Sequence, residues 1–222
     1  MITKLIYPNL CIFCKKVIAT DYHLCLDCQT KLIDYFKCPS CNKFIENYIC
    51  PHCNSEAVIG LFRYDNKARK AIARWKYHDV RKYANSFAKE LSYKLDSNLV
   101  TSLDALIPVP ASKDRLRKRG FNQAYDLSKK LSKIIGVETM DILQRTKRTK
   151  AQHSSNVHER AQNIANSIHL INKFDDIFSE DNAAIALVDD IYTSGNTINE
   201  CIRALRVKYN IKQIYIFVVA IT

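Results

Sequence analysis

Two adjacent carboxylates stand between an apolar run and a hydroxyl-rich turn within residues 184–198. Asp189 and Asp190 follow the apolar run, and the turn Thr193–Thr197 leads into a predicted helix. Backbone N–H groups and hydroxyls at a helix N-terminus bind anions, and Gly195 permits a close approach of the backbone. The carboxylates would repel a phosphate, but they suit a ribose diol or a bridging Mg²⁺. The pattern therefore predicts a site for a sugar phosphate.

Eight of the nine cysteines form four C-x-x-C pairs within the first 53 residues. Each pair offers two thiolates, and two pairs complete the tetrahedral S₄ site for which zinc is the usual ion. Short loops favour joining consecutive pairs, and interleaved pairing is the alternative. The predicted ligand sets are Cys11, Cys14, Cys25 and Cys28 for one zinc ion, and Cys38, Cys41, Cys50 and Cys53 for the other. A site filled by four thiolates has no open position and is therefore structural. The cysteine-rich segment then serves either as a docking surface or only to stabilise the fold.

The chain carries a formal net charge of +12, with basic clusters at residues 112–121 and 144–153. Such an excess indicates an anionic partner, namely nucleic acid, a phosphorylated metabolite or anionic lipid, or else a solvated basic face. No apolar run approaches the roughly 20 residues needed to span a bilayer, and the N-terminus has no apolar segment of secretory length. We therefore expect a cytoplasmic protein, and association with the inner face of the membrane stays open.

From residue 57 onward, short apolar runs alternate with helical patterns. Strands are predicted at residues 57–65, 103–110, 137–143, 183–190 and 212–222, and helices at 66–95, 122–136, 158–168 and 196–209. Buried strands that alternate with helices indicate an α/β domain whose parallel sheet is covered on both faces. We predict two domains, a cysteine-rich domain at residues 1–56 and the α/β domain at residues 57–222.

Three parts of the chain carry a resemblance to known families. The 13 residues from Ile185 to Thr197 resemble the phosphoribosyl pyrophosphate (PRPP) motif of type I phosphoribosyltransferases. The segment IPVPASKDRLRKRGFNQA at residues 107–124 is similar to the signature of the ComF family, and the basic stretch that begins LQRTKRTKAQ is similar to it as well. The four C-x-x-C pairs extend the resemblance to nearly the whole chain. It departs from the family at His78-Asp79, where a glycine and an aspartate are usual.

The resemblance implies a type I phosphoribosyltransferase-like parallel sheet flanked by helices, behind a small double zinc ribbon with two structural Zn²⁺ ions. Asp189 and Asp190 would hold the ribose hydroxyls of PRPP, with Mg²⁺ bound alongside. The 5′-phosphate would lie on the turn residues Thr193, Ser194, Gly195, Asn196 and Thr197. The pyrophosphate would lie near Pro110, Ala111 and Ser112, where Arg115 and Arg119 can supply positive charge. A mobile loop carrying Arg145, Gln152 and Arg160 would close over the ligand.

Members of the ComF family are implicated in natural transformation. The resemblance therefore implies handling of incoming single-stranded DNA, with competence or DNA-uptake proteins as partners. The basic charge and the aromatic residues Tyr64, Trp75, Tyr77 and Tyr83 would suit backbone attraction and base stacking, and core packing is the alternative for each aromatic. The other predicted function is a phosphoribosyltransferase of nucleotide salvage that uses PRPP and Mg²⁺. The sequence identifies no general base, so turnover of PRPP stays an open question.

Overall fold

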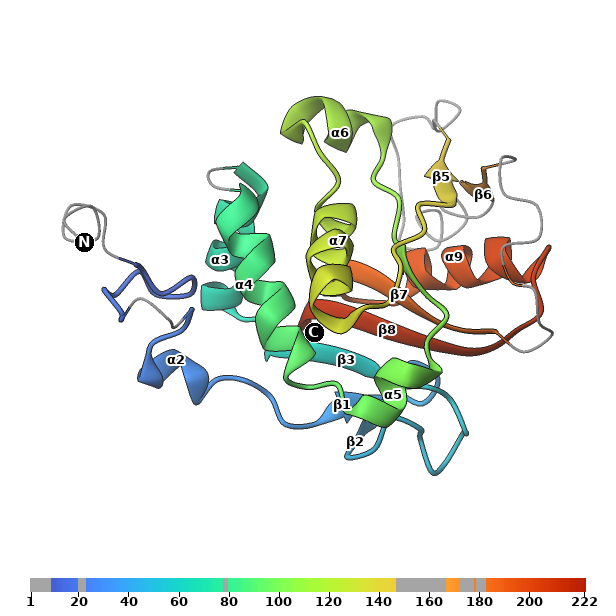
Figure 1. The fold of residues 1–222 in the computed structure, drawn as a ribbon, viewed down its shortest axis with the longest axis horizontal. Coiled ribbons are helices and arrows are strands. Elements are labelled where there is room, and N and C mark those ends of the chain that lie inside the picture. The colour runs from blue at the N-terminus through green and yellow to red at the C-terminus, as the bar shows by residue number, and fades with distance from the viewer. Residues whose placement is uncertain (1–8, 20–22, 78–79, 147–166, 172–177, 179–182) are drawn as a thin grey trace, which may run out of the picture.

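A six-stranded, mostly parallel sheet forms the centre of the protein (Figure 1). The computed structural model describes residues 9–19, 23–77, 80–146, 167–171, 178 and 183–222. The strands of this sheet are β1 (Phe36–Lys37), β2 (Phe44–Ile45), β3 (Val58–Arg63), β4 (Ala105–Pro108), β7 (Ala183–Tyr192) and β8 (Ile211–Ile221). Their order is β2-β1-β3-β8-β7-β4, and the last four run parallel. β1 pairs antiparallel with both β2 and β3, so the cysteine-rich segment extends the sheet of the predicted α/β domain.

Helices cover both faces of the sheet. The described helices are α2 (Leu26–Gln29), α3 (Asn66–Tyr77), α4 (Val80–Ser92), α5 (Ser97–Ser102), α6 (Lys113–Arg119), α7 (Gln123–Ile135) and α9 (Asn196–Arg206). Because side chains alternate along a strand, Ala186 and Val188 of β7 pack into the core formed with α3, α4 and α7. Ile185 and Leu187 of the same strand pack into the opposite core with α9. Burial on both faces explains why β7 is one continuous apolar run.

The predicted helices bury large apolar side chains. Trp75 and Phe87 are fully buried and their rings meet edge to face, with centroids 5.4 Å apart. Leu127 and Leu131 of α7 are also fully buried. α7 ends at Gly136, whose φ of 79° places it in the left-handed region that a C-cap glycine supplies. The amphipathic patterns therefore located both the buried faces and the end of this helix.

The strand predicted at residues 137–143 is wrong for most of its length. The segment makes a single bridge, between Leu106 and Thr139, and a regular strand begins only at Leu143. Glu138 and Asp141 are exposed, and the contact with β4 is limited to two backbone hydrogen bonds, from the N–H of Leu106 to Glu138 and from the N–H of Met140 to Leu106. The strand that follows, β5 (Leu143–Arg145), pairs antiparallel with β6 (Ile168–Leu170) in a separate two-stranded sheet.

The structure adds to the predicted elements at two further segments. The basic segment after Pro110 forms helix α6, in which Ser112 caps the first turn and Gly120 ends the helix with a φ of 79°. The helix predicted at 158–168 lies mostly outside the described residues, and its last residue, Ile168, begins β6. The prediction for the rest of this segment therefore stays untested.

The cysteine-rich segment packs directly on the α/β core. The guanidinium of Arg74 donates to the carbonyl oxygens of Ile12 and Phe13 at 3.1 and 2.7 Å. The ring of Phe13 lies on the ring of Phe62, with centroids 4.2 Å apart. A domain boundary at residue 56 therefore stays a prediction. Over the residues that the structure describes, we find no helix long and apolar enough to cross a membrane.

Candidate functional site

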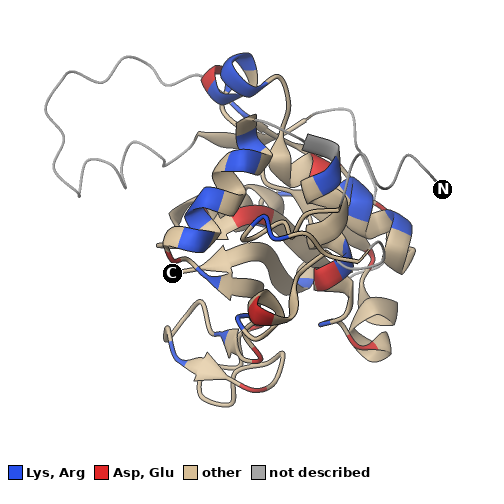
Figure 2. Cartoon of the chain, turned by 90° about the vertical axis from the view of Figure 1, so that its left-hand side faces the viewer, with Lys and Arg blue, Asp and Glu red and all other residues tan. Residues whose placement is uncertain are grey.

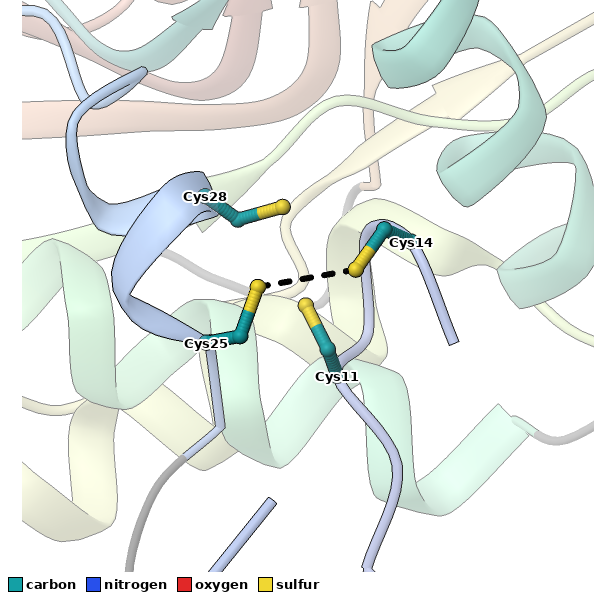
Figure 3. Close-up of side chains that lie close together, drawn as sticks. All are labelled: Cys11, Cys14, Cys25 and Cys28. Atoms are coloured by element: carbon teal, nitrogen blue, oxygen red, sulfur yellow. Dashed lines mark hydrogen bonds between the residues drawn. The ribbon is translucent and has the colours of Figure 1, made fainter. Parts of the chain in front are cut away.

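The eight paired cysteines gather into two groups of four, each a candidate metal centre. Within each group, the four sulfur atoms all lie within 4.8 Å of one another. The groups are Cys11, Cys14, Cys25 and Cys28, and Cys38, Cys41, Cys50 and Cys53, which confirms the prediction that consecutive pairs join. Figure 3 shows the sulfurs of the first group pointing toward one another, with those of Cys14 and Cys25 3.5 Å apart. Each group could hold a structural zinc ion.

Local backbone geometry explains how the cysteine pairs turn inward. In three of the four pairs, the residue after the second cysteine has a positive φ: 70° at Lys15, 59° at Asn42 and 50° at Asn54. Its N–H donates back to the carbonyl of the first cysteine, at 2.9 to 3.0 Å. Asparagine tolerates the left-handed region better than most residues, which suits Asn42 and Asn54 to these positions. The fourth pair, Cys25 and Cys28, begins helix α2.

Backbone donors prepare thiolates in both groups. Burial raises the pKa of Cys11, but hydrogen bonds from the backbone around Cys14, Cys25 and Phe13 outweigh it and lower the pKa to about 7. Similar backbone donors at His52 and Cys53 outweigh burial at Cys50 and lower its pKa to about 6. Because the thiolate is the metal-binding form, each group contains one cysteine that is already inclined to bind a cation.

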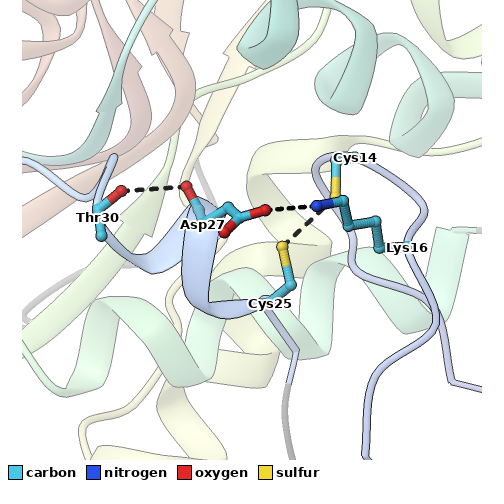
Figure 4. A network of polar contacts seen from close by, with 5 residues as sticks. All are labelled: Cys14, Lys16, Cys25, Asp27 and Thr30. Carbon is cyan, nitrogen blue, oxygen red and sulfur yellow. Dashed lines mark hydrogen bonds and ion pairs between the residues drawn. The ribbon is translucent and has the colours of Figure 1, made fainter.

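An exposed ion pair borders the first cysteine group (Figure 4). The ammonium of Lys16 lies 2.5 Å from the carboxylate of Asp27, and the hydroxyl of Thr30 donates to the carbonyl of Asp27. The side chains of Lys16 and Asp27 are 65% and 70% exposed, so the pair adds little to stability. Its importance is electrostatic, because Lys16 places positive charge beside a group that would carry net negative charge with four thiolates around Zn²⁺.

A second candidate site lies at the carboxyl ends of β4 and β7. These strands are neighbours, but the chain leaves β4 toward α7 on one face and leaves β7 toward α9 on the other. In open α/β sheets, ligands bind in the crevice at such a reversal. Here it holds a pocket of about 40 Å³. That space admits only a few water molecules, so any larger ligand has to extend beyond it.

Most of the residues predicted for the sugar-phosphate site line this pocket. They are Pro110, Ala111, Arg115, Arg119, Arg145, Asp189, Asp190 and Thr197. Ser112 is not among them, because its hydroxyl accepts a hydrogen bond from the N–H of Arg115 and caps α6. Thr193, Ser194 and Asn196 are exposed on the neighbouring turn. Gln152 and Arg160 lie outside the described residues.

The two aspartates differ in charge and partner. Asp190 contacts the ammonium of Lys76, and the two side chains are only 16% and 15% exposed. The carboxylate of Asp189 accepts a hydrogen bond from the N–H of Asp190 at 2.8 Å. Burial and the charge of Asp190 raise the pKa of Asp189 to about 8, although that N–H, Lys76 and Arg115 oppose the change. The pKa of Asp189 therefore lies above the usual range of an aspartate, whereas Asp190 has Lys76 as its direct ion-pair partner.

The turn before α9 is shaped by Gly195. This residue has a φ of 75°, and a Cβ on it would lie 2.7 Å from the hydroxyl of the buried Tyr192. Among the described residues, no side chain caps the first turn of α9, whereas Ser112 and Asn122 cap α6 and α7. The start of α9 therefore presents N–H groups and the positive end of the helix dipole beside the pocket.

Sequence reasoning missed three residues of the site. Asn122 and Gln123 line the pocket and stand inside the segment that carries the ComF resemblance, where their amide groups were a usable signal. Asn122 fixes the start of α7, because it donates to the carbonyl of Val109 at 3.0 Å and accepts from the N–H of Ala124 at 3.1 Å. Lys76 could not be predicted as a site residue from the sequence, because its contact with Asp190 joins segments that are distant in the chain.

The fold and the cysteine groups together define a class of protein. The chain is an α/β protein with a phosphoribosyltransferase-like, mostly parallel sheet flanked by helices, and with two N-terminal four-cysteine groups, as predicted. No protein-family model matches the chain.

Curated relatives narrow this class. Competence protein F of Haemophilus influenzae is 27% identical over 221 residues, which cover 93% of this chain and 94% of that protein. Competence protein ComFC of Streptococcus pneumoniae is 26% identical over 188 residues, 81% of this chain and 79% of that protein. Competence protein ComFC of Bacillus subtilis is 24% identical over 150 residues, 65% of this chain and 56% of that protein. The resemblance to the ComF family is thereby confirmed over nearly the whole chain.

Proposed function

We propose that the pocket at the ends of β4 and β7 binds PRPP or a closely related sugar phosphate. Asp189 and Asp190 hold the ribose hydroxyls, and the turn Thr193–Thr197 with the start of α9 holds the 5′-phosphate. Arg115 and Arg119 face the pyrophosphate. The proposal rests on one observation: an acidic pair, basic side chains and an uncapped helix start lie together at one crevice. A single sugar phosphate carries both the hydroxyls and the anionic groups that these elements would bind.

The donor set fits a magnesium ion bound together with the ligand. Carboxylate oxygens are hard ligands of the kind that Mg²⁺ prefers, and Asp189 and Asp190 both line the pocket. Bound Mg²⁺ would neutralise part of the charge of the pyrophosphate. Lys76 would then be free to turn from Asp190 toward an anionic group of the ligand.

A thermal-shift titration with PRPP, with and without Mg²⁺, tests this proposal. PRPP should raise the melting temperature of the wild-type protein, and Mg²⁺ should strengthen the effect. The Asp189→Asn/Asp190→Asn variant should lose it, while exposed Asp114→Asn should retain it. A wild-type protein that does not respond to PRPP at millimolar concentration would contradict the proposal.

The biological role that we propose is the handling of incoming single-stranded DNA during natural transformation, with competence or DNA-uptake proteins as partners. The similarity to competence proteins supports a role in competence. The net charge of +12 supports an anionic polymer as partner, and Figure 2 shows Lys and Arg recurring along the helices on one side of the molecule. Of the four candidate stacking residues, Trp75 and Tyr83 are buried, so only Tyr64 and Tyr77 remain for base stacking.

Binding of a labelled single-stranded oligonucleotide, measured by fluorescence anisotropy over a range of salt concentrations, tests this role. Because binding that neutralises phosphates releases counterions, affinity should fall steeply as salt rises. Tyr77→Ala should weaken binding, whereas Tyr93→Ala, also exposed, serves as the matched control. Absence of binding at low salt would exclude a direct role in DNA handling.

The second candidate function is a phosphoribosyltransferase of nucleotide salvage. It is favoured by the same pocket, because the groups that bind PRPP are those that would neutralise a leaving pyrophosphate. The measurement that separates it from simple binding is release of pyrophosphate from PRPP when free nucleobases are added. Ligand binding without such release would leave PRPP as a bound ligand only.

A further inference from the structure

Gln123 has an environment unlike that of the other amide in the pocket. It is the first residue of α7, it is only 3% exposed, and it lines the pocket. The guanidinium of Arg119 donates to its side-chain oxygen at 3.0 Å. A guanidinium has no acceptor, so this contact requires the oxygen of the amide to face Arg119. The amide nitrogen of Gln123 must therefore face away from it.

That nitrogen has no acceptor in the part of the chain that the structure describes. A buried N–H₂ group without a partner is costly, and native structures rarely keep one without a reason. The adjacent Asn122 shows the contrast, because both its amide nitrogen and its amide oxygen are bonded to the backbone. The fold therefore satisfies both polar atoms of the Asn122 amide, whereas it satisfies only the oxygen of the Gln123 amide.

The surroundings of Gln123 specify what could satisfy the amide nitrogen. Arg115 and Arg119 line the same pocket, and the guanidinium of Arg119 also lies over the ring of Tyr77, 5.7 Å from its centroid. Arg119 is thus held by Gln123 on one side and by an aromatic face on the other. A group that meets two arginines and an amide donor has to be an anion rich in acceptor oxygens.

We propose that Gln123 is a ligand-binding residue whose amide nitrogen donates to the anionic group held by Arg115 and Arg119. The inference rests on the proposed function, in which that group is the pyrophosphate of PRPP. Gln123 would then help the protein to discriminate PRPP from a sugar phosphate that lacks pyrophosphate. The latter ligand has no acceptor oxygens to place beside Gln123, Arg115 and Arg119.

Two substitutions of Gln123 test the inference, with binding of PRPP and of ribose 5-phosphate measured by calorimetry in the presence of Mg²⁺. Gln123→Met has a similar size and removes the donor together with the acceptor for Arg119. Gln123→Glu keeps an acceptor for Arg119 and replaces the donor by negative charge. Both should weaken PRPP binding about 10- to 100-fold, as expected for a lost hydrogen bond to a charged group. Both should leave the affinity for ribose 5-phosphate within about twofold of wild type, because the turn before α9 is untouched.

The matched control is Gln213→Met, since Gln213 pairs with Ala184 at the amino-terminal end of the parallel strands, away from the pocket at their carboxyl ends. It should bind both ligands as the wild type does. A wild-type protein that binds neither ligand would contradict the proposed function itself. Unchanged PRPP binding in folded Gln123→Met and Gln123→Glu would overturn only the role of Gln123. An equal loss of affinity for PRPP and ribose 5-phosphate would also overturn that role, because it would show that Gln123 acts only structurally.

Discussion

The ammonium of Lys76 contacts the carboxylate of Asp190, although the two side chains come from α3 and β7. This contact places a cation beside two neighbouring aspartates, at a pocket that Arg115, Arg119 and Arg145 also line. Lys76 thereby permits Asp190 to stay charged without a bound metal ion. It also connects the end of α3 to the pocket, so binding of a ligand cation or diol at Asp190 has to compete with Lys76.

The first prediction concerns this ion pair. Lys76→Met leaves Asp190 charged without its partner, so we expect a loss of about 1–2 kcal/mol in the free energy of unfolding at pH 7, less than for a fully buried pair. Lys76→Met/Asp190→Asn should recover most of that loss, because neither charge is then left alone. Lys70→Met on the exposed side of α3 is the control, measured by the same urea titration. Equal effects of Lys76→Met and Lys70→Met would show that the pair contributes nothing.

A second prediction follows from the pKa of Asp189, which is raised to about 8 by burial and by the charge of Asp190. An aspartate in the unfolded chain loses its proton near pH 4, so between about pH 4 and 8 the folded state binds the extra proton. Stability from this group must then fall as pH rises through that window. Asp189→Asn removes the dependence, so its stability relative to wild type should increase from pH 5 to pH 8. Chemical denaturation at both values measures it, and a relative stability that is the same at pH 5 and pH 8 would refute it.

The sequence predicted a large part of the fold and of the site for identifiable reasons. β7 is buried on both faces, so its apolar run predicted a strand without any tertiary information. The Asp189–Asp190 pair directly after that run could therefore be placed at the carboxyl end of the strand. The C-x-x-C spacing likewise favoured the observed membership of both cysteine groups over interleaved pairing, because short loops favour consecutive pairing.

What the sequence could not predict depends on contacts between distant segments. The Lys76–Asp190 contact is one example, because nothing local to α3 indicates which side chain its last turn meets. The pairing of β1 with β3, which joins the cysteine-rich segment to the sheet, is another.

A third prediction compares two glycines that share a backbone conformation. Gly195 and Gly136 have φ values of 75° and 79°, so alanine is strained at both by about 1 kcal/mol. Only at position 195 would the added Cβ also meet a side chain, the hydroxyl of Tyr192 at 2.7 Å, whereas nothing lies within 4 Å at position 136. Gly195→Ala should therefore lower the melting temperature more than Gly136→Ala and should also weaken binding of ribose 5-phosphate. Similar melting temperatures and ligand affinities for the two variants would contradict this account of the turn.

The last prediction concerns metal content. Because each four-cysteine group offers a complete tetrahedral site, the purified wild-type chain should contain close to two zinc ions by elemental analysis. Cys14→Ser removes one ligand from the first group, so zinc content should fall toward one per chain. Cys201→Ala, which alters the buried cysteine of α9 outside both groups, should still contain two zinc ions. Since Ile12 and Phe13 of the first group pack on Arg74 and Phe62, loss of that ion should also lower the melting temperature of the whole protein. A wild-type chain with one zinc ion, or a Cys14→Ser chain with two, would show that the groups do not act as separate sites.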